Sequence, residues 1–184
     1  MNVNLNIFSY KLLVVKKIIM KKVNFKKHPV SLKGNLPEIG KSAPSFNLVK
    51  TDLATISLDD LKGKTLVLNI FPSLDTGVCA TSVRKFNQLA ANMKDTLVLA
   101  ISRDLPFAHS RFCTVEGIEN VIPLSDFRAT TFSTDYGVLM EDGPLQGLLA
   151  RAVVVIDPEM VVRYVQLVPE ITQEPDYDEV LRHL

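Results

Sequence analysis

The segment TLVLNIFPSLDTGVCATSVRKFN, residues 65–87, is the most informative part of this chain for its fold. It opens with an almost unbroken apolar run, which is typical of a strand covered on both faces of a sheet. After Pro72, the residues Cys79, Val83 and Phe86 recur at spacings of four and three, which predicts an amphipathic helix. The stretch therefore predicts a buried strand, a turn and a helix, with Cys79 where the turn meets the helix.

The rest of the chain repeats this alternation and then changes at its end. Glycine, proline and capping residues divide it into further elements, and Asp104 is the expected N-terminal cap of one helix. The expected strands are 23–25, 29–32, 46–49, 65–71, 96–102, 121–124, 150–157 and 161–168, and the expected helices are 57–63, 79–93, 104–117, 129–136 and 174–184. Strands and helices alternate over most of the chain, and the last two strands are expected to form an antiparallel hairpin. This order predicts an α/β fold, with a mixed central sheet flanked by helices on both faces. A further short hairpin is expected at the N-terminal side.

The composition fits one globular domain and excludes several classes of protein. The chain has 184 residues, of which 47% are hydrophobic, and a net charge of +1. Eight lysines and no acid precede Glu38, after which 13 basic and 20 acidic residues give a net charge of −7. A nucleic-acid-binding face would need clustered basic residues, so we expect no nucleic-acid partner. Two cysteines are too few for a disulfide scaffold or an all-cysteine zinc site.

The basic leader, residues 1–22, has short apolar runs that are interrupted by lysines. No run reaches the ~20 apolar residues of a membrane-spanning helix, and the order of charge and apolar residues differs from that of a signal peptide. We interpret residues 1–19 as an appendage to a domain that covers 20–184, and we expect a cytoplasmic protein of bacterial type. A weak membrane-surface segment is the alternative, because lysines beside apolar residues bind anionic lipid.

Cys79 is the first candidate for chemistry. It is expected at the carboxyl end of a central strand and at a helix N-terminus, which is where open α/β sheets bind ligands. Unpaired N–H groups and the helix dipole at that position stabilise a thiolate, the form of cysteine that attacks electrophiles. The competing interpretation is an inert core cysteine, since free cysteines are often buried. Thr76, three residues earlier, favours chemistry because its hydroxyl can reach the sulfur.

Cys113 follows in the next predicted helix. It is either a packing residue, beside Leu105 and Val115 in an apolar stripe, or a second thiol that resolves an oxidised Cys79. A disulfide needs Cα atoms within ~7 Å, which two helices on a sheet reach only after local unwinding. A metal site formed by His109, Cys113 and Cys79 is a weaker alternative, because no CxxC or HxxxH pair is present. We expect His109 to be a surface residue.

Four stretches resemble the thiol peroxidases, the Tpx-type atypical two-cysteine peroxiredoxins. The resemblance covers residues 20–184 and is carried by FPSLDTGVCATSVRKFN (71–87), SRDLPFAHSRFC (102–113), DGPLQGLLARAVVVID (142–157) and QLVPEITQEPDY (166–177). It implies a thioredoxin-like fold with an extra N-terminal β-hairpin, and a homodimer. Residues 1–19 lie outside the family pattern.

The resemblance also implies roles for individual residues. Cys79 matches the peroxidatic cysteine, Cys113 the resolving cysteine of an intramolecular Cys79–Cys113 disulfide, and Pro72, Thr76 and Arg151 match the active-site proline, threonine and arginine. The implied activity is reduction of hydrogen peroxide and organic hydroperoxides, with thioredoxin as reductant and without metal, flavin or haem. A non-enzymatic redox sensor and an inert structural protein are the competing classes.

Overall fold

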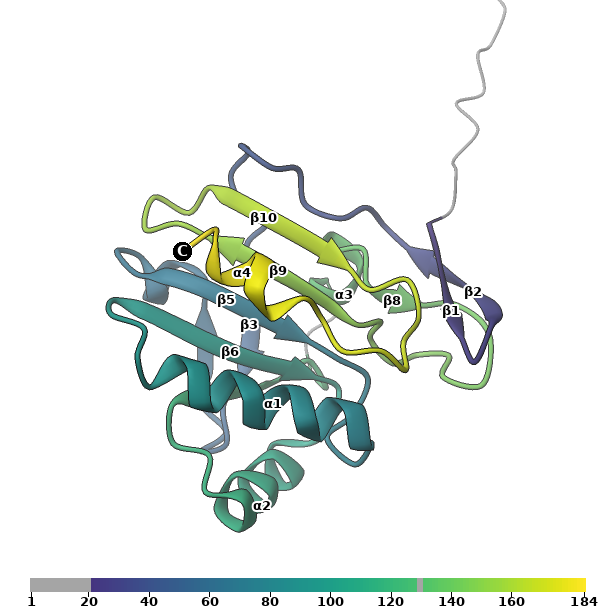
Figure 1. Ribbon diagram of the computed structural model, residues 1–184, viewed down its shortest axis with the longest axis horizontal. Helices are drawn as coiled ribbons and strands as arrows, with labels where there is room; N and C mark the ends of the chain where they lie inside the picture. Colours follow the sequence, from purple (N-terminus) through teal and green to yellow (C-terminus); the bar gives the residue numbers. More distant parts are fainter. Residues whose placement is uncertain (1–20, 129–130) are drawn as a thin grey trace, which may run out of the picture.

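The computed structural model describes residues 21–128 and 131–184, and its main feature is a seven-stranded mixed sheet (Figure 1). The strand order is β10-β9-β5-β6-β7-β3-β4. Its strands are β3 (Asn47–Val49), β4 (Thr55–Ser57), β5 (Thr65–Ile70), β6 (Thr96–Ser102), β7 (Val121–Ser125), β9 (Ala152–Ile156) and β10 (Val162–Leu167). β5, β6 and β7 run parallel, whereas β9 pairs antiparallel with both β5 and β10. The predicted mixed sheet is therefore confirmed.

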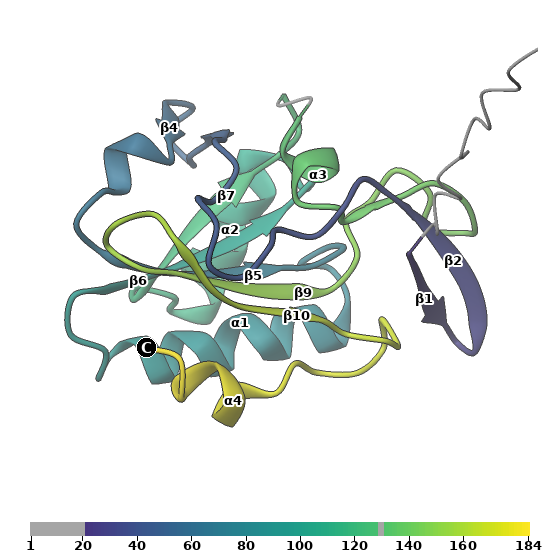
Figure 2. The same cartoon turned by 90° about the horizontal axis from the view of Figure 1, so that it is seen from above.

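Helices cover both faces of this sheet, as the alternating sequence predicted. They are η1 (Asp59–Leu61), α1 (Gly77–Ala90), α2 (Pro106–Glu116), α3 (Phe132–Asp135) and α4 (Tyr177–Leu181). Figure 2 shows α1 and α4 on one side of the sheet and α3 on the other. Each face has its own apolar core, because side chains alternate along the buried strands: in β9, Val153 faces α1, and Val154 faces α3 and η1.

The expected N-terminal hairpin is also present and belongs to a second, three-stranded sheet. It consists of β1 (Lys22–Phe25) and β2 (His28–Lys33), and β2 pairs in turn with β8 (Leu139–Met140). Figure 1 shows the hairpin beside the end of the large sheet at which α1 begins. Backbone hydrogen bonds tie it to the loop after β10, from Asn24 N to Pro169 O and from Ile171 N to Asn24 O.

Three predicted helices are shorter than expected. Ser57 and Asp60 cap the start of the segment 57–63 with reciprocal hydrogen bonds, but the segment forms only the single turn η1, because Lys62 already leaves the helical conformation and Gly63 takes a left-handed φ of 83°. The C-terminal helix begins at Tyr177, where Asp176 caps it by accepting a hydrogen bond from Glu179 N. Of the segment 129–136, α3 covers Phe132–Asp135, and residues 129–130 lie outside the described part.

The expected domain boundary near residue 20 also falls at the edge of the described residues. Within residues 21–128 and 131–184, no helix is long and apolar enough to cross a membrane.

Candidate active site

Cys79 lies in the first turn of α1, directly beyond the end of β5. Its side chain is buried, with 1% of its surface exposed. Thr76 is the residue that precedes the helix, and its backbone is extended. Pro72, also buried, starts the turn between strand and helix. The local sequence thus fixes the sulfur at the carboxyl edge of the sheet, as predicted.

Arg151 reaches the same place from a distant part of the chain. It directly precedes β9, whose first residue, Ala152, pairs with Ile70 at the end of β5. Alternation along the strand puts Arg151 on the same face as Val153, which is the face that α1 covers. Register and alternation together therefore place the guanidinium beside Cys79, 72 residues away in sequence.

Two side chains contact the sulfur of Cys79. Thr76 Oγ1 lies 2.8 Å from Sγ, and Arg151 Nη2 lies 3.2 Å from it. Thr76 Oγ1 also lies 3.0 Å from the carbonyl oxygen of Ser73, so its one proton has two acceptors within reach. A guanidinium donates and never accepts, so its contact with Sγ favours a negatively charged sulfur.

The guanidinium of Arg151 is almost fully buried, with 1% of the residue exposed. Its Nε donates to the carbonyl oxygen of Ile171 at 3.1 Å. Its Nη1 is buried and has no hydrogen-bond partner among the described residues. Since a buried donor without an acceptor is costly, this N–H group marks a position for a polar ligand atom.

A cavity of about 230 Å³ opens beside this constellation. It is lined by Phe25, Pro72, Thr76, Gly77, Val78, Leu145, Arg151, Ile171 and Thr172. Three of the five predicted site residues therefore line one cavity, next to the sulfur of Cys79. Its other walls are mostly apolar side chains, which come from the start of α1, the hairpin, the loop before β9 and the loop after β10.

Asp104 holds the turn that carries Cys79, although the sequence predicted it as the cap of α2. Leu105 precedes α2 instead, and no side chain caps that helix. The Asp104 carboxylate accepts hydrogen bonds from Leu74 N and Ser73 Oγ, both at 2.7 Å. The prediction was wrong because the two donors of the Cys79 turn, 30 residues away, outcompete the local helix terminus.

Cys113 lies in α2, and its thiol is half-buried against the apolar cluster that includes Cys79. The two sulfurs are not bonded, and burial raises the pKa of the Cys113 thiol above its ordinary value. The expected apolar stripe around it is wrong, since Leu105 and Val115 are 49% and 76% exposed. The structure thus brings Thr76 and Arg151 to Cys79 and leaves Cys113 on the neighbouring helix.

His109 is buried, with 1% exposed, and the expectation of a surface residue is wrong. Its Nε2 lies 3.0 Å from Ser102 Oγ, which also donates to Asp104. Burial lowers the pKa of His109 to about 4, against the opposing charge of Asp104. Within residues 21–128 and 131–184, no three His, Cys, Asp or Glu side chains form a group that could hold a metal ion.

Sequence reasoning assigned no role to Asp104 as a turn-holding residue, to Ile171 as an acceptor for Arg151, or to Phe25 as a cavity wall. The quoted motifs contain the first two within SRDLPFAHSRFC and QLVPEITQEPDY. Their contacts join segments that are distant in sequence, which periodicity and capping rules do not detect.

Comparison with known proteins places this chain in a family. The sequence model of the Redoxin family matches residues 38–181. The chain is 55% identical to a thiol peroxidase of Corynebacterium glutamicum over 165 residues, which are 90% of this chain and 99% of the relative. A thiol peroxidase of Mycobacterium tuberculosis is 52% identical over the same shares.

Solved structures agree with this assignment. A peroxiredoxin-like protein of Aquifex aeolicus superposes with a TM-score of 0.83 at 47% identity, over 89% of this chain and 95% of that one. A thiol peroxidase from Chromobacterium violaceum, 23% identical, shares the fold with a TM-score of 0.82 over 88% and 93%. The chain belongs to the Redoxin family and, within it, to the thiol peroxidases. The resemblance stated from the motifs and the thioredoxin-like fold that it implied are confirmed, and the close relatives imply thiol peroxidase activity.

Proposed function

We propose that this chain reduces hydroperoxides with Cys79 as the attacking, peroxidatic thiolate and Cys113 as the resolving thiol. The pair of contacts that Thr76 Oγ1 and Arg151 Nη2 make with Cys79 Sγ carries this proposal. A buried cation within hydrogen-bond distance of a sulfur stabilises the thiolate form. A hydroxyl that contacts the same sulfur fixes the orientation of the cysteine side chain. Pro72, buried at the start of the turn, keeps water from the sulfur.

In the first step the thiolate attacks the near oxygen of the peroxide, in line with the O–O bond. The S–O bond forms as the O–O bond breaks, the sulfur is oxidised to a sulfenic acid, and the departing oxygen takes a proton and leaves as water or an alcohol. The free Nη1–H group of Arg151 supports this step, because it can donate to a peroxide oxygen that gains negative charge.

In the second step the Cys113 thiol attacks the sulfenic sulfur. A disulfide forms within the chain and water leaves. Because Cys113 lies in the middle of α2, part of that helix unwinds for the sulfurs to meet. Thioredoxin then returns two electrons by thiol–disulfide exchange. The cycle uses only the two cysteines, and no metal, flavin or haem takes part.

The cavity beside the sulfur supports organic hydroperoxides as substrates in addition to hydrogen peroxide. Apolar groups such as Val78, Leu145 and Ile171 line it, while Thr76 and Arg151 supply the polar contacts. An apolar substituent on the peroxide would displace water from these walls, which favours binding.

Peroxide consumption with thioredoxin, thioredoxin reductase and NADPH tests the proposal. Cys79→Ser should abolish even the first turnover. Cys113→Ser should keep a fast first turnover, lose cycling with thioredoxin, and accumulate sulfinic acid under excess peroxide. Mass spectrometry of the wild type after one equivalent of peroxide should show the loss of two hydrogens within one chain. Normal cycling of Cys113→Ser, or a disulfide between two chains, would remove the resolving role of Cys113. A wild type whose thiols oxidise without sustained peroxide consumption would instead be a redox sensor.

Arg151 is tested by Arg151→Met. A charge-assisted hydrogen bond contributes ~1.5–3 kcal/mol, so the peroxide step should slow by at least ~10-fold. Arg151→Lys should be impaired too, since a point charge does not replace the planar fork that joins Ile171 O and Cys79 Sγ. A near-normal rate in both variants would leave Arg151 with a structural role only.

We further propose a homodimer and a cytoplasmic location for this protein. Apolar side chains are exposed at the start of α2, where Leu105 and Phe107 are 49% and 65% exposed, and this supports a face covered by a second copy. Sedimentation of the wild type and Phe107→Glu should give a dimer and a monomer, respectively.

We also propose that residues 1–19 are an appendage to the domain. Deletion of residues 1–19 should leave folding and peroxidase activity intact. Loss of either would show that the domain begins before residue 20.

A further inference from the structure

The tip of the N-terminal hairpin has an unusual backbone. Phe25 pairs with His28, so the turn consists of Lys26 and Lys27 alone. Both lysines have a positive φ, 51° and 70°. Turns of this geometry usually contain Asn-Gly, because residues with a Cβ are strained there. Something outside the hairpin must therefore stabilise this tip.

The carboxylate of Glu170, in the loop after β10, supplies that stabilisation. Its Oε1 accepts a hydrogen bond from Lys26 N and its Oε2 one from Lys27 N, both at 3.0 Å. Oε1 also accepts from the backbone N–H and the hydroxyl of Thr172, at 3.2 and 2.9 Å. One carboxylate thus joins both amides of the hairpin tip to the residue that lines the cavity beside Cys79.

The same loop is part of the peroxide site. Ile171, next to Glu170, accepts the hydrogen bond from Arg151 Nε and lines the cavity together with Thr172. Glu170 therefore lies between the hairpin on one side and the residues that hold Arg151 on the other.

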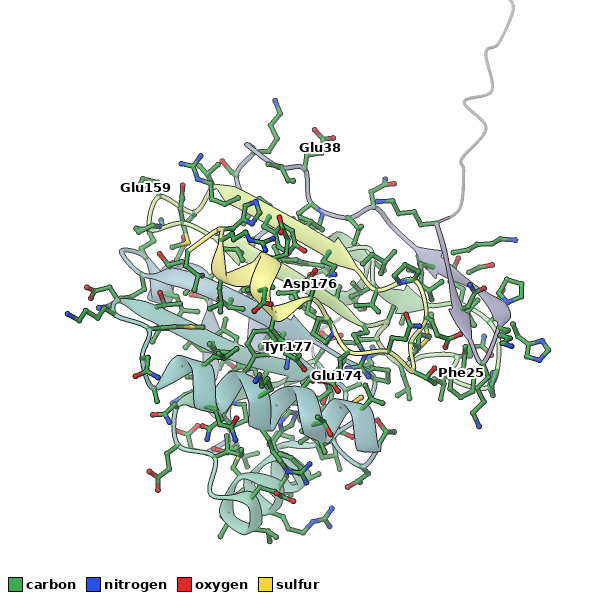
Figure 3. All side chains as sticks on the ribbon, in the orientation of Figure 1. Phe25, Glu38, Glu159, Glu174, Asp176 and Tyr177 are labelled. Carbon is green, nitrogen blue, oxygen red and sulfur yellow. The ribbon has the colours of Figure 1, made fainter. Side chains whose placement is uncertain are left out.

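Phe25 is the side chain that the hairpin contributes to this cavity. It is half-buried and lies in the last position of β1, directly before the strained turn. Figure 3 shows Phe25 at the hairpin tip, near the loop that follows β10. β1 lies outside the seven-stranded sheet, so the position of this ring depends on the two backbone hydrogen bonds of Asn24 to the loop after β10 and on how the tip beyond it is held.

We propose that Phe25 is a specificity-determining wall of the hydroperoxide cavity, and that Glu170 is the positioning residue that holds it there. The proposal rests on the proposed peroxidase function of Cys79. A large apolar substituent on a hydroperoxide contacts the Phe25 ring, whereas hydrogen peroxide needs only the sulfur, Thr76 and Arg151. The hairpin thus distinguishes bulky hydroperoxides from hydrogen peroxide.

The test is the ratio of kcat/KM for cumene hydroperoxide to kcat/KM for hydrogen peroxide, at saturating thioredoxin. Loss of an aromatic wall from an apolar pocket corresponds to roughly a 10-fold loss of discrimination, so Phe25→Ala should lower the ratio by about that factor. Phe25→Leu, which keeps an apolar side chain, should lower it less. Both changes should appear as a higher KM for cumene hydroperoxide.

Glu170→Gln should lower the same ratio, because an amide accepts at one end only and cannot serve both backbone N–H groups of the tip. Lys27→Gly in the Glu170→Gln background should restore part of the ratio, because glycine removes the strain at one positive φ. If Glu170 had only a structural role, Lys27→Gly would not restore the ratio of kcat/KM for cumene hydroperoxide to kcat/KM for hydrogen peroxide. Glu159→Gln, in the β9–β10 turn at the opposite end of the molecule in Figure 3, is the matched control and should leave the ratio unchanged.

Two results would overturn the inference. Equal losses of kcat/KM for the two peroxides in Phe25→Ala and Phe25→Leu would show that the hairpin supports the site as a whole and does not select substrates. An unchanged ratio in all hairpin variants would show that the Phe25 ring contacts no substrate. A wild type that consumes neither peroxide would be a different failure, since it would overturn the proposed function itself.

Discussion

The helices that carry the two cysteines are held to the sheet in different ways. α1 buries Cys79, Val83 and Phe86 in the apolar core, and its exposed face is polar. The buried residues of α2 are only Pro106 and His109, although its sequence is also rich in apolar side chains.

Hydrogen bonds between polar side chains hold α2 against the rest of the protein. His109 Nε2 meets Ser102 Oγ inside the protein, and Glu116 binds Arg84 of α1 through two hydrogen bonds at the surface. A packed apolar face separates only at a large cost, whereas hydrogen bonds can be exchanged for bonds with water. The helix that carries Cys79 is thus built into the core, and the helix that carries Cys113, which has to move in the proposed cycle, is attached by exchangeable bonds.

The largest expected difference between the helices is in stability. Phe86 is fully buried in α1, with its ring 5.2 Å from that of Tyr177, and Phe86→Ala should lower the free energy of unfolding by ~3–5 kcal/mol. Val115→Ala, on an exposed part of α2, should change it by less than ~0.5 kcal/mol. Urea denaturation followed by circular dichroism measures both. A similar loss for Val115 would show that α2 contributes more apolar burial than the structure shows.

The second difference is a pH dependence that belongs to α2 alone. Burial lowers the pKa of His109 in the folded protein to about 4 from an ordinary 6.5, so the unfolded chain binds the proton more readily between these values. Stability from the neutral imidazole is complete above pH 6.5 and decreases as the pH falls towards 4, by about 3 kcal/mol.

His109→Gln removes this titration. The free energy of unfolding should therefore fall more steeply between pH 7 and 4.5 in the wild type than in the variant, as measured in urea at each pH. Parallel pH profiles for the two proteins would mean that His109 stays accessible to protons in the folded state.

Within α2, the buried and exposed contacts should also differ. Ser102→Ala removes the hydroxyl shared by Asp104 and His109 and should lower the free energy of unfolding by ~1–3 kcal/mol, because His109 remains buried and Asp104 partly buried without it. Glu116→Gln weakens the exposed ion pair with Arg84 and should leave the urea midpoint unchanged within error. If the two variants lost similar stability, the surface pair would be as important to α2 as the internal bond.

The smallest expected effect concerns the reactivity of Cys113. Burial raises the pKa of its thiol above the ordinary 9.0, so alkylation by iodoacetamide in the Cys79→Ser background should show a midpoint above that pH. Unfolding in urea should bring the midpoint back to the ordinary value. A midpoint below 9.0 in the folded protein would reveal a charge that assists Cys113 before any helix unwinds.

The sequence predicted the central elements of the fold well. The expected strand 96–102 coincides with β6, and the expected strand 65–71 differs from β5 by one residue. Both are long apolar runs between clear breaks, for which burial alone decides the structure. Of the two side chains that contact Cys79, Thr76 was predicted from the local sequence. Arg151 was expected only from the resemblance, since no local pattern relates residues so far apart.

The errors share a physical cause. For α2, an apolar periodicity predicted a buried stripe through Leu105 and Val115, whereas the buried positions include His109. For Asp104, a local capping rule was applied to a carboxylate that binds Ser73 and Leu74 instead. Buried polar side chains follow long-range hydrogen-bond partners, and those partners are known only once the strands have been placed side by side.

The register between β5 and β9 has a consequence for how long Arg151 stays beside Cys79. Ile70 and Ala152 are cross-strand partners, so Arg151 is attached to the central ladder of the sheet and not to a loop. A slip of one residue would turn its guanidinium to the opposite face. Amides in such central ladders exchange with solvent only in the rarest openings of a protein. The charge beside Cys79 should therefore persist through the partial unwinding of α2 that the proposed cycle requires, and be lost only when the sheet itself comes apart.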